Sequence, residues 1–443
     1  MKLPFRSVSL SERDIPPVWV STIPHTWAYD TMSRRILEDI LPRIIEDNRD
    51  EMTKEASVLG PNCLIQLTEL RDSLTCGTNG YLRSLNDNGP DQGVWNSILL
   101  QIPDSQRNWL QAPWLIAEFY FYRRVIEAFR YFDTNYDMFA KQKHAGLVDS
   151  MLFISQLADS LPSLLGEENK RVVLEVGMYT SLWGNKMDLS LWPKHHNSNA
   201  VKIQSSVNDD HSGGQISIGS SLKRLEAYIL DNHIEDVVSH LLDHTNLSNN
   251  TPIRVDIVLD NAGYELVSDL FLVYLLLSLG ITSTVMLHTK AHPTFVSDAT
   301  TEDVLYTLDY LASYPSNRAV STLGSTLKHY IEQGRLVAQD DLFWCQPHIF
   351  WNLSPTLTTT LSQSHLVILK GDANYRRAVG DCQWTHVNAT DVLSYWPAPV
   401  CALRALKAEV ACGISAEQEA YARRQDQHWL VSGKWAVVQF HGH

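Results

Sequence analysis

The sequence predicts an α/β protein: a three-layer α/β/α domain with a mainly parallel sheet, plus a helical N-terminal part. Up to about residue 150, apolar residues recur at helical spacing. From Ser221 onward, short β-branched runs alternate with helical segments, a pattern typical of parallel sheets with right-handed crossovers. We therefore expect a helical part over residues 1–150 and an α/β/α domain over residues 151–443, with a polar mobile loop at 192–221.

Composition narrows the class of protein and its partners. Hydrophobic residues make up 44% and charged residues 19%, as in ordinary globular proteins. The net charge of -14 argues against nucleic acid as a partner and leaves room for a small anionic substrate. Six scattered cysteines favour reduced thiols, and no stretch reaches the roughly 20 apolar residues of a membrane span. We expect a cytoplasmic protein without a membrane partner; the oligomeric state stays open.

The strongest helix of the N-terminal part is predicted over Trp114 to Phe132, where apolar residues form a broad stripe. Glu118 and Tyr122 lie four residues apart on one face of it. The pattern favours a solvated charged edge on a core helix, and Glu118 is also a candidate site residue.

One segment before the alternating strands and helices admits more than one interpretation. Val173 to Gly177 resembles the first motif of methyltransferases that bind S-adenosylmethionine, but the further glycines of that turn are missing. A helix that runs into a turn at Gly184-Asn185 fits at least as well. After the polar loop, a helix is predicted over Leu222 to Leu242.

Three predicted strands end in polar residues. Val255–Leu259 is followed by Asp260-Asn261, Thr282–Leu287 by a loop that ends at Asp298, and His365–Leu369 by a polar and basic cluster from Lys370 to Arg376. A plain interpretation is helix capping: Asp260 and Asn261 before the helix at 264–279, and Ser297 or Asp298 before the helix at 301–312.

The alternative is a shared site, because the carboxyl ends of parallel strands meet at one edge of the sheet. Asp260, Asn261 and Asp298 offer the oxygen ligands that hard divalent cations prefer. Lys370, Asn374 and Arg376 offer donors for an anion. A cation site beside an anion site indicates metal-assisted phosphoryl chemistry, and the absence of a Walker loop argues against nucleoside triphosphate hydrolysis by that route.

Four blocks carry a resemblance to a known family: Leu182–Ser190, Leu259–Leu266, Phe295–Asp298 and Lys370–Arg376. They resemble the metal-dependent damage-control phosphatases, and within these the sugar-phosphate phosphatase branch, which is also described as an acidic residue (protein-glutamate) methyltransferase. The block Trp114 to Arg124 fits the same branch.

The resemblance implies a phosphatase that hydrolyses phosphate monoesters of small sugars, such as fructose 1-phosphate, in metabolite damage control. It implies that Asp260, Asn261 and Asp298 bind the cofactor, a divalent metal ion (Mn²⁺, Ni²⁺, Co²⁺ or Mg²⁺), and carry catalysis. The residues that it implies for substrate binding are Asp372, Asn374, Tyr375 and Arg376, with Lys370 beside them, and Arg404 and Lys407 of an Arg-Thr-x-Lys motif. In that motif Ala405 replaces the threonine, which puts the fine substrate preference in doubt.

Other roles stay open at this point. Asn185 and Asp188 are substrate contacts, or simply turn residues. The phosphoryl group is attacked by water or by an aspartate oxygen. Two different functions remain as alternatives: an S-adenosylmethionine-dependent protein carboxyl methyltransferase, with Glu265 and Asp298 at the cofactor, and a sugar-phosphate or metal sensor without turnover.

Overall fold

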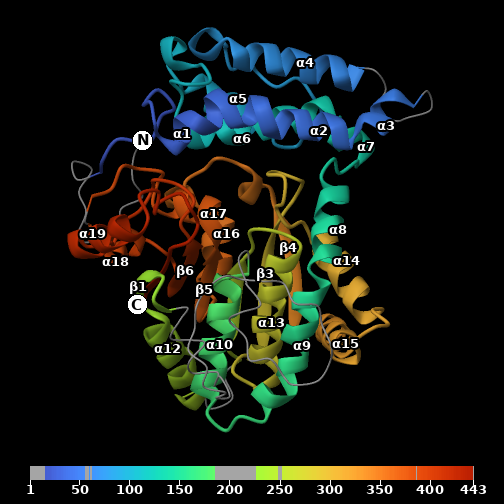
Figure 1. Ribbon diagram of the computed structural model, residues 1–443, viewed down its shortest axis with the longest axis vertical. Helices are drawn as coiled ribbons and strands as arrows, with labels where there is room; N and C mark the ends of the chain where they lie inside the picture. The colour runs from blue at the N-terminus through green and yellow to red at the C-terminus, as the bar shows by residue number, and fades with distance from the viewer. Residues whose placement is uncertain are drawn as a thin grey trace, which may run out of the picture.

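Figure 1 shows the computed structural model, which describes residues 15–54, 59, 62–184, 226–247, 252–385 and 387–442. The described residues form a seven-stranded sheet in the order β1-β7-β6-β5-β2-β3-β4. The strands are β1 (Ile229–Asn232), β2 (Arg254–Val258), β3 (Thr284–Lys290), β4 (Leu336–Asp341), β5 (Leu366–Lys370), β6 (Val400–Ala405) and β7 (Ala436–His441).

The sheet is mainly parallel, as predicted. β6, β5, β2, β3 and β4 run in one direction, whereas β7 is antiparallel to β6 and β1 is parallel to β7. Because β2 lies between β5 and β3, the carboxyl ends of these three strands are neighbours at one edge.

Helices cover both faces of the sheet, which confirms the predicted α/β/α layers. Val255 and Ile257 of β2 belong to a core cluster with one set of helices, and Val258 belongs to a second cluster on the other face. The first set is α9 (Met151–Leu165), α10 (Lys170–Leu182), α12 (Ile234–Leu247), α13 (Tyr264–Ser278), α14 (Thr301–Ala312) and α15 (Arg318–Glu332). The second is α16 (Pro355–Leu361), α17 (Gly371–Ala378), α18 (Ala389–Leu393) and α19 (Ala416–Gln425), with the 3-10 turns η6 (Leu342–Cys345) and η7 (Phe350–Asn352).

The N-terminal helices form a separate layer across one end of the sheet domain (Figure 1). They are α1 (Trp27–Asp30), η2 (Thr31–Ile40), α2 (Leu41–Asp47), α3 (Arg49–Thr53), α4 (Asn62–Thr75), α5 (Gln92–Leu100), α6 (Trp114–Ala128) and α7 (Tyr131–Thr134). α8 (Ala140–Asp149) leads from this layer to α9. The layer has its own apolar core, on which Phe295 and Val296, from the segment after β3, also pack. The helical layer, as we call it, therefore lies over the carboxyl edge of the strands. None of the described helices is long and apolar enough to cross a membrane.

Two local expectations are wrong. The helix predicted over Leu222 to Leu242 is interrupted by β1, because β7, about 200 residues away, pairs with Ile229–Asn232 and imposes an extended backbone. The N-cap of α14 is Thr300, which exchanges hydrogen bonds with Asp303 in a capping box. Asp298 is therefore not needed as a cap. The predicted loop at 192–221 lies outside the described residues, and the division at residue 150 stays a prediction.

Candidate active site

The predicted metal ligands come together at the carboxyl edge of β2 and β3. Asn261 and Asp298 form an isolated antiparallel bridge, and the Ala299 amide donates to the Asp260 carbonyl at 2.9 Å. The Ser297 hydroxyl donates to Asn261 Oδ1 at 2.5 Å. Backbone and side-chain hydrogen bonds thus hold the two strand ends against each other.

The structure also decides against the capping interpretation of Asp260 and Asn261. The N-cap of α13 is Gly263, with φ of 68°, and it makes no side-chain cap hydrogen bond. The Asn261 amide donates instead to Asp260 Oδ2 and to Glu265 Oε2, at 2.9 and 2.8 Å. The side chains of Asp260 and Asn261 therefore do not cap α13.

Negative charge accumulates at this point. Burial, together with the carboxylates of Glu265 and Asp298, raises the pKa of Asp260 well above its usual value, although Lys290 and Lys407 act in the opposite direction. Lys290 Nζ lies 2.7 Å from Asp298 Oδ2, and both side chains are buried. The sequence interpretation did not single out Lys290. Its place at the carboxyl end of a strand that precedes Asp298 could have indicated a role at the site.

The donor set fits a hard divalent cation. Two carboxylates and one amide oxygen come from adjacent strand ends, and their surplus negative charge is unfavourable in a buried site unless a cation offsets it. The described residues contain no group of three or more His, Cys, Asp or Glu arranged to hold a metal ion. The donor set of Asp260, Asn261 and Asp298 has two acids and one amide, and would leave positions open for other ligands of the ion.

Most residues predicted for anion binding lie buried in protein contacts. Lys370 Nζ donates to the Ser181 carbonyl and lies 3.1 Å from Asp269 Oδ1. The Asn374 amide donates to the carbonyls of Leu259 and Lys370, both at 3.0 Å, and Tyr375 donates to Gln439 at 2.8 Å.

Arg376 and Arg404 are engaged in the same way. The Arg376 guanidinium lies over the Trp114 ring at 3.5 Å and pairs with Glu118 at 2.6 Å and with Asp381 at 2.8 Å. Arg404 is 2.8 Å from Asp372 and donates to the carbonyls of Val410 and Ala408. Protein contacts therefore occupy both guanidinium groups.

Among the described residues predicted for substrate binding, Asp372 and Lys407 remain partly exposed. The Lys407 amide donates to Asp372 Oδ1 at 3.3 Å, so the two residues are held together. Asn185 and Asp188 lie outside the described residues.

Gly371, the first residue of α17, is a further site residue that the sequence interpretation did not single out. It has φ of 80°, and a Cβ added there would lie 1.8 Å from Asp260 Oδ2. Only glycine lets the start of α17 approach the Asp260 carboxylate this closely. The positive end of the α17 dipole therefore faces the site.

The helical layer closes the site from above, where a solvated helix edge was expected. That expectation is wrong: Tyr122 is buried, and Glu118 pairs with Arg376 of the sheet domain. The Phe295 ring packs against Tyr122 and Phe119, at centroid distances of 4.6 and 4.8 Å. A contact with a helix about 250 residues away could not be foreseen from a local pattern.

The methyltransferase-like segment does not form the strand and turn that its motif requires. Val173 to Gly177 lie inside α10, and a Cβ on Gly177 would meet Leu272 of α13 at 2.9 Å. This glycine serves helix packing.

Comparisons with known proteins show the family to which the chain belongs. The family model described as the damage-control phosphatase ARMT1-like domain matches residues 32–422. Damage-control phosphatase ARMT1 of Danio rerio is 32% identical, over 97% of this chain and 98% of its own length. The proteins of that name from Mus musculus and Homo sapiens are 33% and 30% identical, over 85% and 94% of this chain and 86% and 96% of their own lengths. A crystal structure of a DUF89 family protein from Pyrococcus horikoshii has a TM-score of 0.39 and 13% identity, over 83% of this chain and 97% of that one. On the family model and the curated relatives, this chain belongs to the damage-control phosphatase family.

Proposed function

We propose that this protein hydrolyses phosphate monoesters of small sugars, such as fructose 1-phosphate, with a divalent metal ion held by Asp260, Asn261 and Asp298. The observation that carries the proposal is the bridge between Asn261 and Asp298, which brings two carboxylates and an amide oxygen to one edge of the sheet. Membership of a phosphatase family supports the reaction class.

A divalent ion bound there would supply positive charge for the phosphoryl oxygens and would lower the pKa of a bound water. Lys290 holds one oxygen of Asp298, which keeps this carboxylate oriented. Lys407, partly exposed and close enough to act on the pKa of Asp260, binds the phosphate and offsets its charge in the transition state. Glu118, Tyr122 and Phe295 limit the space above the edge and exclude water from it.

The test begins with chelator-stripped protein and a screen of sugar phosphates with Mn²⁺, Co²⁺, Ni²⁺ and Mg²⁺. We expect no turnover without metal and recovery with at least one of these ions. Failure to hydrolyse any phosphate ester with any ion would refute the proposal.

Two variants separate catalysis from stability. Asp260→Asn should lower kcat/KM at least about 100-fold, because it removes a metal ligand. Since burial raises the pKa of Asp260, this variant should melt no lower than the wild type without metal. Asp256→Asn is the matched control: Asp256, on the same strand, pairs with Arg254 and His288 at 2.6 and 2.8 Å. It should melt lower and keep its metal affinity.

A further inference from the structure

The loop Ala291 to Asp298 connects β3 to α14 and carries a predicted metal ligand at its end. Its inner side is held at the site, by Ser297 on Asn261 and by Lys290 on Asp298. Its outer side faces the helical layer, and two residues, His292 and Phe295, anchor it there.

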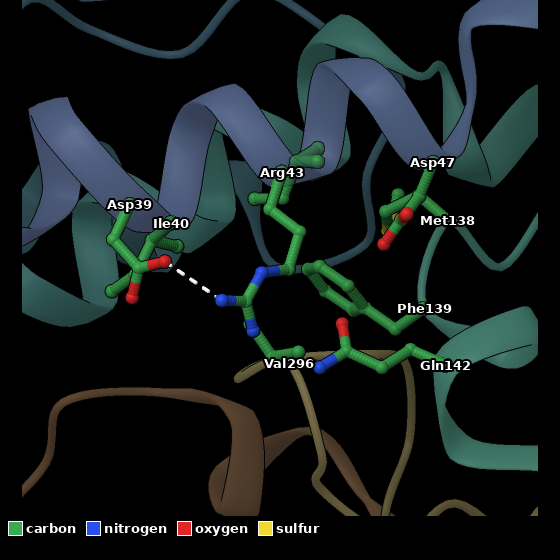
Figure 2. A pocket seen from close by; sticks show the side chains of 9 residues that line it. Asp39, Ile40, Arg43, Asp47, Met138, Phe139, Gln142 and Val296 are labelled. Atoms are coloured by element: carbon green, nitrogen blue, oxygen red, sulfur yellow. Dashed lines mark hydrogen bonds and ion pairs between the residues drawn. The ribbon is translucent and has the colours of Figure 1, made fainter. Parts of the chain in front are cut away.

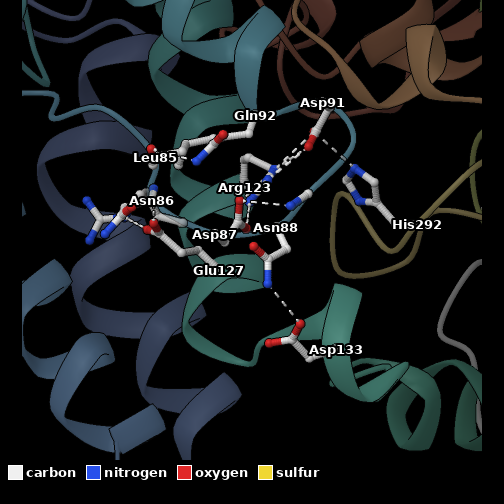
Figure 3. A network of polar contacts seen from close by, with 12 residues as sticks. Leu85, Asn86, Asp87, Asn88, Asp91, Gln92, Arg123, Glu127, Asp133 and His292 are labelled. Carbon is white, nitrogen blue, oxygen red and sulfur yellow. Dashed lines mark hydrogen bonds and ion pairs between the residues drawn. The ribbon is translucent and has the colours of Figure 1, made fainter.

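His292 is the polar anchor. Its side chain is 1% exposed and packs against the rings of Tyr131 and Phe132, at centroid distances of 6.1 and 5.5 Å. Its Nε2 lies 3.6 Å from Oδ2 of Asp91, which is fully buried in the helical layer (Figure 3). Asp91 is fixed in turn by Arg123 of α6, whose guanidinium donates to both of its oxygens at 2.8–3.1 Å.

His292 and Asp91 each shift the pKa of the other towards the charged form. Burial alone would lower the pKa of His292, but Cys345 and Asp91 raise it to about 10. Burial would raise the pKa of Asp91, but His292 and Arg123 bring it below its usual value. A buried pair of this kind is costly to break, because the remaining charge has no water around it.

Phe295 is the second anchor, through its contacts with Phe119 and Tyr122. The next residue, Val296, borders a pocket whose other lining residues belong to the helical layer and the start of α8, among them Arg43, Phe139 and Gln142 (Figure 2). After the buried residues 292–294, the loop is partly buried at Phe295 and Val296 and exposed at Ser297, before it reaches the buried Asp298.

We propose that Asp91 and His292 are positioning residues for Asp298, so that a carboxylate of the helical layer tunes the metal affinity of the site. This inference rests on the proposed function, since it assumes that Asp298 binds the metal. Removing the Asp91 charge lets the His292 end of the loop move, and Asp298 moves with it.

The experiment compares Asp91→Asn with Asp87→Asn. Asp87 is the matched control, since it accepts hydrogen bonds from the same Arg123 at 2.7 and 2.9 Å and from the Gly89 amide, whereas His292 contacts Asp91. Mn²⁺ dissociation constants are measured by calorimetry on full-length, chelator-stripped protein, together with melting curves without metal. Loss of a hydrogen-bond partner behind a ligand weakens metal binding 10- to 100-fold; for this more remote pair we expect about 5- to 10-fold in Asp91→Asn. Asp87→Asn should stay within about twofold of the wild type, on the same scale.

Saturating Mn²⁺ should restore most of the kcat of Asp91→Asn, which a general loss of structure would not allow. If Asp91→Asn does not fold, His292→Gln removes the same charge pair from the loop side and should give the same shift. Unchanged Mn²⁺ affinity in the folded variant, or an equal loss in Asp87→Asn, would overturn the positioning role. A wild-type protein that binds Mn²⁺ nowhere, or binds it without turnover, contradicts the proposed function itself and is distinguished by that result.

Discussion

Replacing Gly371 by alanine tests whether the contact between α17 and Asp260 is required for the site. The added Cβ would lie 1.8 Å from Asp260 Oδ2 and 2.3 Å from its Cγ. Non-bonded carbons prefer separations of about 3.5 Å or more, so the carboxylate has to move by roughly 1.5 Å. Metal–ligand distances tolerate only about 0.2 Å, and a misplacement of about 1 Å costs around 100-fold in rate.

The variant also strains the backbone, because Gly371 has φ of 80°. This strain costs about 1–2 kcal/mol for an alanine. Gly334→Ala is the matched control: Gly334 has φ of 68°, and no atom lies within 4 Å of an added Cβ. It carries the same kind of strain without the clash.

Urea unfolding without metal should show a loss of about 1–2 kcal/mol in Gly334→Ala, from the backbone strain alone. The loss should be larger in Gly371→Ala, because the clash with Asp260 adds to this strain. Calorimetry with Mn²⁺ should show weakened binding in Gly371→Ala only, and kcat/KM on a sugar phosphate should fall about 100-fold in that variant alone. Wild-type Mn²⁺ affinity and turnover in Gly371→Ala would refute the reasoning, as would an equal loss of activity in Gly334→Ala.

Three further changes probe other parts of the molecule. Arg376→Met leaves Glu118 and Asp381 buried without their partner, so unfolding free energy should fall by about 3–5 kcal/mol in urea titrations; unchanged stability with a raised KM would instead assign Arg376 to the substrate. Lys407→Ala should raise KM for sugar phosphates about tenfold, as expected for one lost charged hydrogen bond, and leave the melting temperature unchanged; an unchanged KM removes this lysine from the substrate pocket. Burial and then Arg377 lower the pKa of His348 to about 4. Between pH 6.5 and 4, His348 therefore binds fewer protons in the native protein than in the unfolded chain. The free energy of unfolding falls as the pH falls through this range. His348→Phe should flatten that part of the stability profile, and a wild-type slope in the variant would contradict this assignment.

The sequence by itself determined the fold class and predicted that three polar clusters meet at one edge of the sheet. The β-branched runs at Val255–Leu259 and His365–Leu369 locate β2 and β5 to within a residue or two, because a buried parallel strand needs continuous apolar residues on both faces. Polar residues directly after three such runs are a local signal, and parallel topology alone brings them to one edge. For that reason the sequence alone predicts that Asp260, Asn261 and Asp298 lie close together.

Only the tertiary structure decided what each of these side chains is free to do. Arg376, a predicted phosphate ligand, is paired with Glu118, 258 residues earlier in the chain, and no local pattern reports a partner at that distance. β1 is a strand because β7 pairs with it, and such pairing outweighs the local secondary-structure propensity of these residues. The need for glycine at position 371 arises from a carboxylate on a neighbouring strand. Residue types within a short stretch of sequence indicate which chemistry is possible there. Burial, strand pairing and close approach depend on residues that meet only after the chain has folded.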